Sequence, residues 1–275
     1  MKIRQSITSL LILISPVISM AANLIESKDQ DGMTSRMYID NNRARFEMPG
    51  NGGRIIIDLD KQNMHLVIDD QRIIINMSSA LKSDRSNAIK QAGFTIKALG
   101  NGPTIAGYTT REYEEYVNDQ YCGSVFNSTS AMNDLGIDKF ARAFTAMAEE
   151  LDSLFASMPG NPATNFIDKC DRADISLSYQ MKDIGFPLKS TDQNRQQDTL
   201  VTRIDKKASL PANAFGLPKN YKITTAQNFV NDMMQQVPQG IQTMIQNIPP
   251  ETMKQMMQNI PPEMMEMIQK QMQGQ

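Results

Sequence analysis

The sequence predicts an α+β fold in which an antiparallel β-sheet carries one long helix and a helical unit follows at the C-terminus. Three observations support this class: apolar and polar residues alternate over much of residues 24–128, one later segment has a helical apolar stripe, and the C-terminal composition changes to Met, Gln, Ile and Pro. With 275 residues, of which 40% are hydrophobic, the chain is long enough to bury a sizeable core.

The composition narrows the possible functions. The formal net charge of −2 gives no basic footprint for nucleic acid, so we expect no nucleic-acid partner. The chain has one histidine, His65, which excludes metal sites and catalytic relays that need two. No complete catalytic, phosphate-binding or metal-binding motif is present, so the sequence identifies no catalytic residue, no cofactor and no metal ligand.

The N-terminal segment has the pattern of a secretory signal peptide. Lys2 and Arg4 supply the positive start, residues 7–18 are mainly apolar, and small residues end the segment at Ala21. The alternative is a membrane anchor, but the apolar run is shorter than the roughly 20 residues that cross a bilayer. We therefore expect residues 1–21 to be cleaved and the mature chain to be periplasmic, or alternatively secreted, without a transmembrane segment.

Export gives the two cysteines a simple interpretation. Cys122 and Cys170 form an even pair, and in an oxidising compartment such a pair is expected to be a disulfide. The alternative is a redox-active pair, which usually has close C-x-x-C spacing. The wide separation favours a structural bridge.

The first part of the body predicts a series of antiparallel strands. Runs rich in Ile, Val, Tyr and Phe are separated by clusters of Asp, Asn and Gly, which is typical of hairpins. The continuous apolar run Ile73–Ile75 indicates a strand that is covered on both faces. The expected strands in this part are 33–39, 43–48, 54–58, 64–68 and 71–77.

Helices interrupt the strand pattern twice in the second part of the body. A short helix is expected over residues 78–92 and a long one over 134–158, where Pro159 and Gly160 would end it. The apolar stripe of the long helix is expected to pack on the inner face of the sheet. The remaining expected strands are 94–99, 104–115, 121–128, 175–181, 187–190 and 199–206.

Several short stretches, in their order and spacing, resemble one family. These stretches are 37–47, 55–58, 105–108, 185–189 and the run Leu210–Lys222. Together they are similar, over about residues 24–223, to the exported family catalogued as domain of unknown function 4412, which is similar in outline to the outer-membrane lipoprotein carrier superfamily. The resemblance implies a strongly curved half-barrel with helices on its concave side and an apolar cavity, but no catalytic residues. The long helix would then line the cavity with Phe140, Phe144, Met147 and Leu151.

The C-terminal unit, residues 224–275, is a degenerate repeat outside the resemblance. Ile-Pro-Pro-Glu occurs at residues 248–251 and again at 260–263, and proline followed by Glu suits the first turn of a helix. Each predicted helix carries an apolar stripe at i, i+3, i+4 spacing. The methionines expected to form a hydrophobic binding surface are Met244, Met253, Met256, Met257, Met264 and Met267.

Several interpretations of these methionines remain open. Flexible thioether side chains adapt to irregular apolar partners, which favours a binding surface. The helices could instead pack on the body, or the tail could be partly disordered, because helices this short are marginal alone. Binding of copper(I) is a weaker alternative, because no histidine is near, and the sulfurs could also serve as oxidant targets.

These observations lead to one functional hypothesis with two alternatives. The hypothesis is a non-enzymatic periplasmic binding protein in which residues 22–223 enclose an apolar cavity for a lipid, an acyl chain or a lipidated partner. The first alternative is a protein-interaction or chaperone-like module that acts through the Met-rich helices. The second is a hydrolase whose catalytic residues have no recognisable motif.

Overall fold

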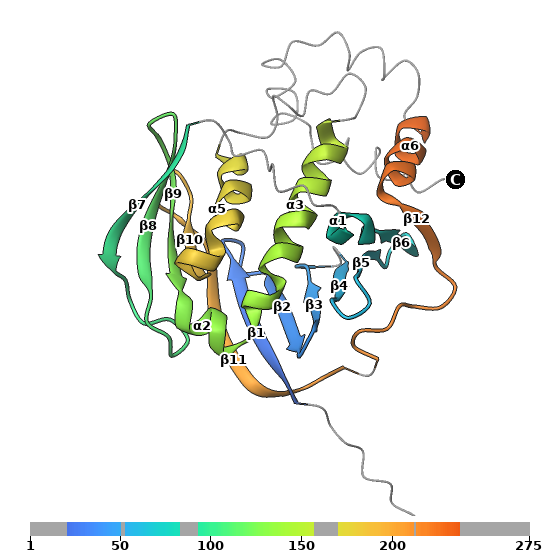
Figure 1. Cartoon of the computed structure of the whole chain (residues 1–275), viewed down its shortest axis with the longest axis horizontal. Coiled ribbons are helices and arrows are strands. Elements are labelled where there is room, and N and C mark those ends of the chain that lie inside the picture. The colour runs from blue at the N-terminus through green and yellow to red at the C-terminus, as the bar shows by residue number, and fades with distance from the viewer. Residues whose placement is uncertain (1–20, 51–52, 83–92, 157–169, 212, 237–275) are drawn as a thin grey trace, which may run out of the picture.

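The computed structural model describes residues 21–50, 53–82, 93–156, 170–211 and 213–236 (Figure 1). Residues 1–20 of the predicted signal peptide and the six tail methionines lie outside these residues, whereas Ala21 is the first residue of β1. The described strands are β1 (Ala21–Asp29), β2 (Thr34–Asp40), β3 (Arg43–Glu47), β4 (Arg54–Asp58), β5 (Asn63–Ile68), β6 (Ile73–Asn76), β7 (Phe94–Asn101), β8 (Arg111–Val117), β9 (Gln120–Ser128), β10 (Phe186–Thr191), β11 (Gln197–Ser209) and β12 (Lys222–Thr225). The described helices are α1 (Ser78–Lys82), α2 (Thr129–Asp134), the 3-10 helix η1 (Ile137–Phe140), α3 (Ala141–Ala156), α5 (Asp171–Ile184) and α6 (Ala226–Gln236).

All twelve described strands form a single open sheet in the order β12-β6-β5-β4-β3-β2-β1-β11-β10-β9-β8-β7. Every pair is antiparallel except β12 and β6, which run parallel. The centre of the sheet joins segments far apart in sequence, because β1 pairs with β11 and Ile25 lies opposite Ile204. The predicted α+β class with a large open antiparallel sheet is confirmed.

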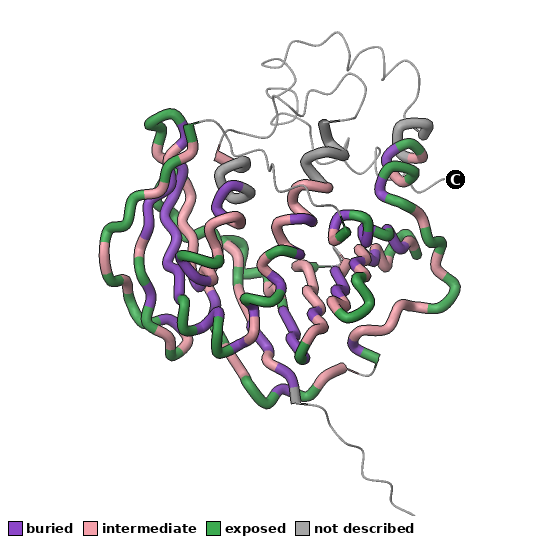
Figure 2. The backbone as a smooth tube through the Cα atoms, viewed as in Figure 1, coloured by how far each residue is buried: buried purple, intermediate pink, exposed green. Residues whose placement is uncertain are grey.

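The sheet curves around the helices, and α3 and α5 lie side by side across its concave face (Figure 1). The main core forms between this face and the helices. Its most deeply buried large side chains include Phe140, Ile57 and Met64. Figure 2 shows that buried residues concentrate on the inner strands and helix faces, whereas the edge strand β7 is exposed or only partly buried.

The opposite, outer face of the sheet also carries an apolar cluster. Side chains alternate between faces along a strand, so Ile75 joins the main core while its neighbour Ile74 joins Ile56 and Val67 on the outer face. The prediction that the Ile73–Ile75 strand is covered on both faces is therefore confirmed.

The segment 213–221, here called the strap, covers this outer cluster. Phe215, Leu217 and Tyr221 pack against it, and the backbone N–H of Lys222 then donates to the oxygen of Arg72 at 2.9 Å. This bond brings the chain alongside β6, where β12 pairs with it. The Leu210–Lys222 run that contributed to the family resemblance is thus mainly the strap.

The predicted long helix is divided in the structure. Ser128 begins α2 as its N-cap and accepts a hydrogen bond from the backbone N–H of Ala131 at 3.2 Å. Gly136, at φ 70°, then turns the chain in a left-handed conformation before η1 and α3. In α3, the main part of the predicted helix, Ala143 and Ala146 are buried in the main core.

The strand predicted at 175–181 is wrong, because these residues lie within α5. The local alternation of apolar and polar residues fits a strand, but Leu177, Met181 and Ile184 are also spaced for one face of a helix. Leu177 and Ile184 pack against Tyr113 and Val125 of the sheet, and this packing selects the helix.

Other predicted boundaries shift. The strand expected from residue 104 begins at Arg111, because the two backbone hydrogen bonds between Ile105 and Tyr108 close a turn first. The helix expected over 78–92 is described only as α1, since residues 83–92 lie outside the described part. The described fold also continues past the boundary expected after residue 223, because β12 and α6 pack on the body. Within the described residues, no helix has both the length and the apolar character needed to cross a membrane.

Candidate functional site

Of the predicted cavity-lining residues, Phe140 ends the 3-10 helix η1, and Phe144, Met147 and Leu151 lie in α3, which follows it directly. Phe140 is fully enclosed and belongs to the main core, so it fills space in the interior. Phe144 and Met147 are half-buried, each with one side against the core. The side chain of Leu151 lies outside the described part of the structure. The structure thus places Phe140 in the core and leaves Phe144 and Met147 partly accessible above it.

Residues from two other helices extend this apolar surface. Met181 of α5 and Phe229 of α6 are also half-buried and pack against the same core. Because α3 contacts both α5 and α6, the four side chains belong to adjoining helices. We call Phe144, Met147, Met181 and Phe229 the helix platform, and it is the candidate binding surface.

Polar contacts hold the platform helices together. The hydroxyl of Thr145 donates to the backbone oxygen of Ser178 at 3.4 Å, which links α3 to α5. The hydroxyl of Tyr179 donates to Glu149 at 2.5 Å between the same helices. Phe144 and Met147 therefore lie on a helix, α3, whose position relative to α5 is fixed by these two hydrogen bonds.

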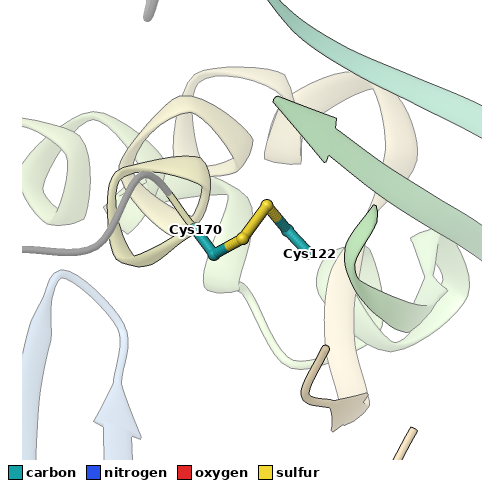
Figure 3. Close-up of a disulfide and its surroundings, with 2 residues drawn as sticks. All are labelled: Cys122 and Cys170. Carbon is teal, nitrogen blue, oxygen red and sulfur yellow. A yellow bond between two sulfur atoms is a disulfide. The ribbon is translucent and has the colours of Figure 1, made fainter. Parts of the chain in front are cut away.

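The predicted disulfide is confirmed, and it fixes the N-terminal end of α5. Cys122 of β9 is bonded to Cys170, immediately before α5, with a Cα–Cα distance of 5.1 Å (Figure 3). Cys122 is buried beside Val117, in a small cluster that Phe94 also contacts. The bridge therefore ties the start of α5 to the β7–β9 end of the sheet.

His65 lies in β5 on the outer face of the sheet, because its neighbour Met64 is in the main core and Val67, two residues on, is in the outer cluster. Its direct cross-strand neighbours are Ile56 and Asn76, and burial lowers its pKa below the ordinary value. These neighbours offer no nucleophile and no carboxylate, so the surroundings favour a neutral imidazole that packs on the outer face.

A polar cluster of Tyr108, Asp134 and Lys206 lies at the edge of the main core. Tyr108 and Lys206 both donate to the same carboxylate oxygen of Asp134, which connects a turn, α2 and β11. The hydrogen bonds from Lys206 and Tyr108 lower the pKa of Asp134, and the hydrogen bond to Asp134 raises the pKa of Lys206. In this arrangement the charges are already paired, so the cluster fastens three segments together.

A metal site needs several ligating side chains close together. No cluster of three or more His, Cys, Asp or Glu residues with that capacity occurs in this part of the chain. The Met-rich tail, which carries the copper alternative, lies outside it.

The sequence predicted two of the four platform residues. Phe144 and Met147 were predicted because the α3 stripe is long and regular. Met181 was assigned to a strand, although its spacing from Leu177 and Ile184 could have identified a helix. Phe229 was missed because the predicted boundary separated it from the body, although Ala226 and Val230 beside it have helical spacing and are buried.

Comparison with known proteins adds little to this description. No family model matches the chain, and no curated protein matches it, so membership of the family known as domain of unknown function 4412 is not shown. A crystal structure of MucB is similar at a TM-score of 0.32 and 12% identity, over 75% of this chain and 60% of that one. The match therefore spans less than two thirds of that protein.

Proposed function

We propose that this protein is an exported, non-enzymatic binding protein that receives an apolar group on its helix platform. The occupant would be an acyl chain, a lipid, a lipidated partner or an apolar protein segment. The proposed location is the periplasm, because the first 21 residues have the pattern of a signal peptide.

The half-buried state of the platform residues is the observation that carries this proposal. Four large apolar side chains on three adjoining helices keep part of their surface accessible while their other side packs on the core. Because all four side chains pack against one core and their helices adjoin α3, their accessible surface supports a binding surface on this side of the core.

The chemistry of the platform suits an occupant of irregular shape. Two of its four residues are methionines, whose unbranched side chains adjust to different partners. Each methylene group that an acyl chain buries there would contribute roughly 0.8 kcal/mol, without any covalent step. The disulfide and the α3–α5 hydrogen bonds would keep the surface preorganised.

A fluorescent fatty acid tests the proposal directly. We expect the purified protein to bind the probe, and Met147→Gln to weaken binding about three- to tenfold, in line with the loss of roughly 1 kcal/mol of apolar contact. Met33→Gln is the matched control, because Met33 is exposed on the β1–β2 turn. Equal affinities of the two variants, or no binding by the unaltered protein, would contradict the proposal.

The position of α6 supports a second candidate, an interaction module that uses the Met-rich tail. This helix contacts α3 and ends at Gln236, and most of the tail methionines follow it in the sequence. A chain truncated after Gln236 keeps β12 and α6, whereas truncation after Tyr221 would remove both. Mass spectrometry of copurified lipid and protein distinguishes the candidates: lipid bound by both chains supports the platform, and a client bound only by the full-length chain supports the tail.

A further inference from the structure

The last helix of the platform, α6, is also the helix from which the Met-rich tail continues. Phe229 of α6 packs against the main core, and α6 contacts α3, which carries Phe144 and Met147. Helix α6 ends at Gln236, and residues 237–275, here called the tail segment, follow it directly in the sequence. The tail segment is therefore tethered to a helix that itself belongs to the platform.

The tail segment has a sequence suited to an apolar surface of this kind. Ile-Pro-Pro-Glu occurs at residues 248–251 and 260–263, and proline is favoured in the first turn of a helix. Between the two motifs, Met253, Met256 and Met257 form an apolar stripe at helical spacing, with Lys, Gln and Asn at the other positions. Short helices are marginal alone in water, so each predicted unit needs an apolar surface to pack on.

The dimensions and the chemistry of the stripe match those of the platform. A helix over residues 251–260 would rise about 15 Å, and α3, with 16 residues, rises about 24 Å, so one unit is short enough to lie along α3. Neither the stripe nor the four platform residues carry a charge, so their contact desolvates no ionised group. Methionines on both surfaces, including Met147 and Met181 on the platform, can adjust to one another in shape.

The covalent connection favours this contact over contact with a separate molecule. A segment joined to its binding site is present at an effective concentration that reaches the millimolar range for a short connection. A contact too weak to hold two separate chains together can therefore hold within one chain.

We propose that the tail segment binds in cis to the helix platform through its methionine stripe and competes there with an external apolar occupant. This inference rests on the platform of the proposed function as the receiving surface, but on no particular external ligand. A ligand then binds with an affinity that is reduced in proportion to the fraction of chains whose platform is free of the tail segment. The tail segment thus sets the affinity that a ligand needs to occupy the platform.

Oxidation by dilute hydrogen peroxide, followed by mass spectrometry of the full-length protein, tests the contact without any ligand. Sulfoxide formation follows the exposure of the sulfur, so a bound tail segment protects Met147 and Met181. The stripe variant carries Met253→Gln, Met256→Gln and Met257→Gln. We expect it to oxidise at Met147 and Met181 about three- to tenfold faster than the unaltered chain.

Two controls accompany the stripe variant. The polar-face variant, Gln255→Ala with Gln258→Ala, changes the opposite side of the same predicted helix and should oxidise at the unaltered rate. Met33, which is exposed on the β1–β2 turn, should oxidise equally in all chains, which excludes general unfolding. Equal rates at Met147 in the stripe and polar-face variants would overturn the proposal. Protection that disappears on dilution would also overturn it, because the contact would then come from a second copy of the chain.

The fluorescent fatty acid separates this inference from the proposed function. If the tail segment competes, the stripe variant binds the probe about three- to tenfold more tightly than the unaltered chain does. Equal probe affinity despite faster oxidation would contradict competition. Faster oxidation with no probe binding by either chain would support binding of the tail segment and refute the proposed function. Unchanged oxidation, with probe binding that Met147→Gln weakens, would refute the inference and leave the proposed function standing.

Discussion

The guanidinium of Arg45 donates a hydrogen bond of 3.0 Å to the backbone oxygen of Ala214, which lies 169 positions later in the sequence. This bond holds the strap against the outer face of β3. The strap in turn covers the outer apolar cluster and leads the chain to β12, so one side chain near the start of the fold helps to place its last strand.

Arg45→Gln is expected to destabilise the protein by about 2–3 kcal/mol, because it removes a charged donor from Ala214 and the partner of half-buried Glu47. Urea unfolding measures the change. Arg203→Gln is the control, and since Arg203 is 56% exposed its loss should cost less than about 1 kcal/mol. Equal losses in the two variants would show that Arg45 does not fasten the strap.

Gly185, between α5 and β10, should not tolerate a side chain. Its φ is +96°, and an added Cβ would lie 2.4 Å from the carbonyl carbon of Ser128. We expect Gly185→Ala to cost more than about 3 kcal/mol through strain and a forced backbone shift. Gly32→Ala is the matched control, with φ +77° but no atom within 4 Å, and should cost only about 1–2 kcal/mol. Thermal unfolding of both variants checks the difference, and comparable losses would contradict the close contact.

Removal of the disulfide should loosen α5 and lower global stability. The loop-entropy relation for a separation of 48 residues gives a loss of roughly 4 kcal/mol for the Cys122→Ala, Cys170→Ala double variant. Urea unfolding measures the change in the free energy of unfolding. Hydrogen exchange is expected to show that loss of the bridge speeds the exchange of α5 amides more than that of β1 amides. Unchanged protection of α5 would show that its packing on the sheet is sufficient without the bridge.

The stability of the protein should fall as the pH drops below about 6.5, the ordinary pKa of histidine. Burial lowers the pKa of His65, so the folded state binds its proton less readily than the unfolded chain. The contribution of neutral His65 is thus fully present above about pH 6.5 and is lost as the pH falls through the unfolded-state value toward the lower folded-state value.

The free energy of unfolding, measured between about pH 8 and pH 5, tests this expectation because the chain has one histidine. His65→Gln should remove this part of the slope. The carboxylates whose pKa is lowered, such as Glu26, do not add to the slope in this range: their stabilising effect is fully present above about pH 4.5 and is lost only as the pH falls below it. The same slope in His65→Gln and in the unaltered protein would contradict a buried neutral His65.

Local patterns predicted the elements well where they had one interpretation. The strand at 54–58 matches β4, and the run Ile73–Ile75 correctly indicated burial on both faces, because no helix or one-sided strand accommodates three consecutive branched apolar residues so simply. The prediction failed at 175–181, where the pattern fits both a strand and a helix. The contacts of Leu177 and Ile184 with the sheet select the helix. Their partners there, Tyr113 and Val125, are too distant in the sequence for a local pattern to reveal them.

The candidate site was likewise predictable only where it depends on a local pattern. Phe144 and Met147 follow from the stripe of α3, which is determined by residues three and four positions apart. Their association with Met181 and Phe229 depends on helix contacts between distant segments. The grouping of Arg36, Arg45 and Arg54 on the outer face was not predicted, because these residues come together only when β2, β3 and β4 pair in register.

The sequence by itself determined the order of most strands and helices, the bond between Cys122 and Cys170, and the unusual concentration of methionines between residues 233 and 272. Only the tertiary structure decided that β1 pairs with β11 at the centre of the sheet, that the strap crosses the outer face, and that polar groups gather there. The physical reason is the range of the interactions. Periodicity and turn chemistry act over a few residues, whereas strand register, helix packing and the pairing of buried charges join residues that the chain itself keeps far apart.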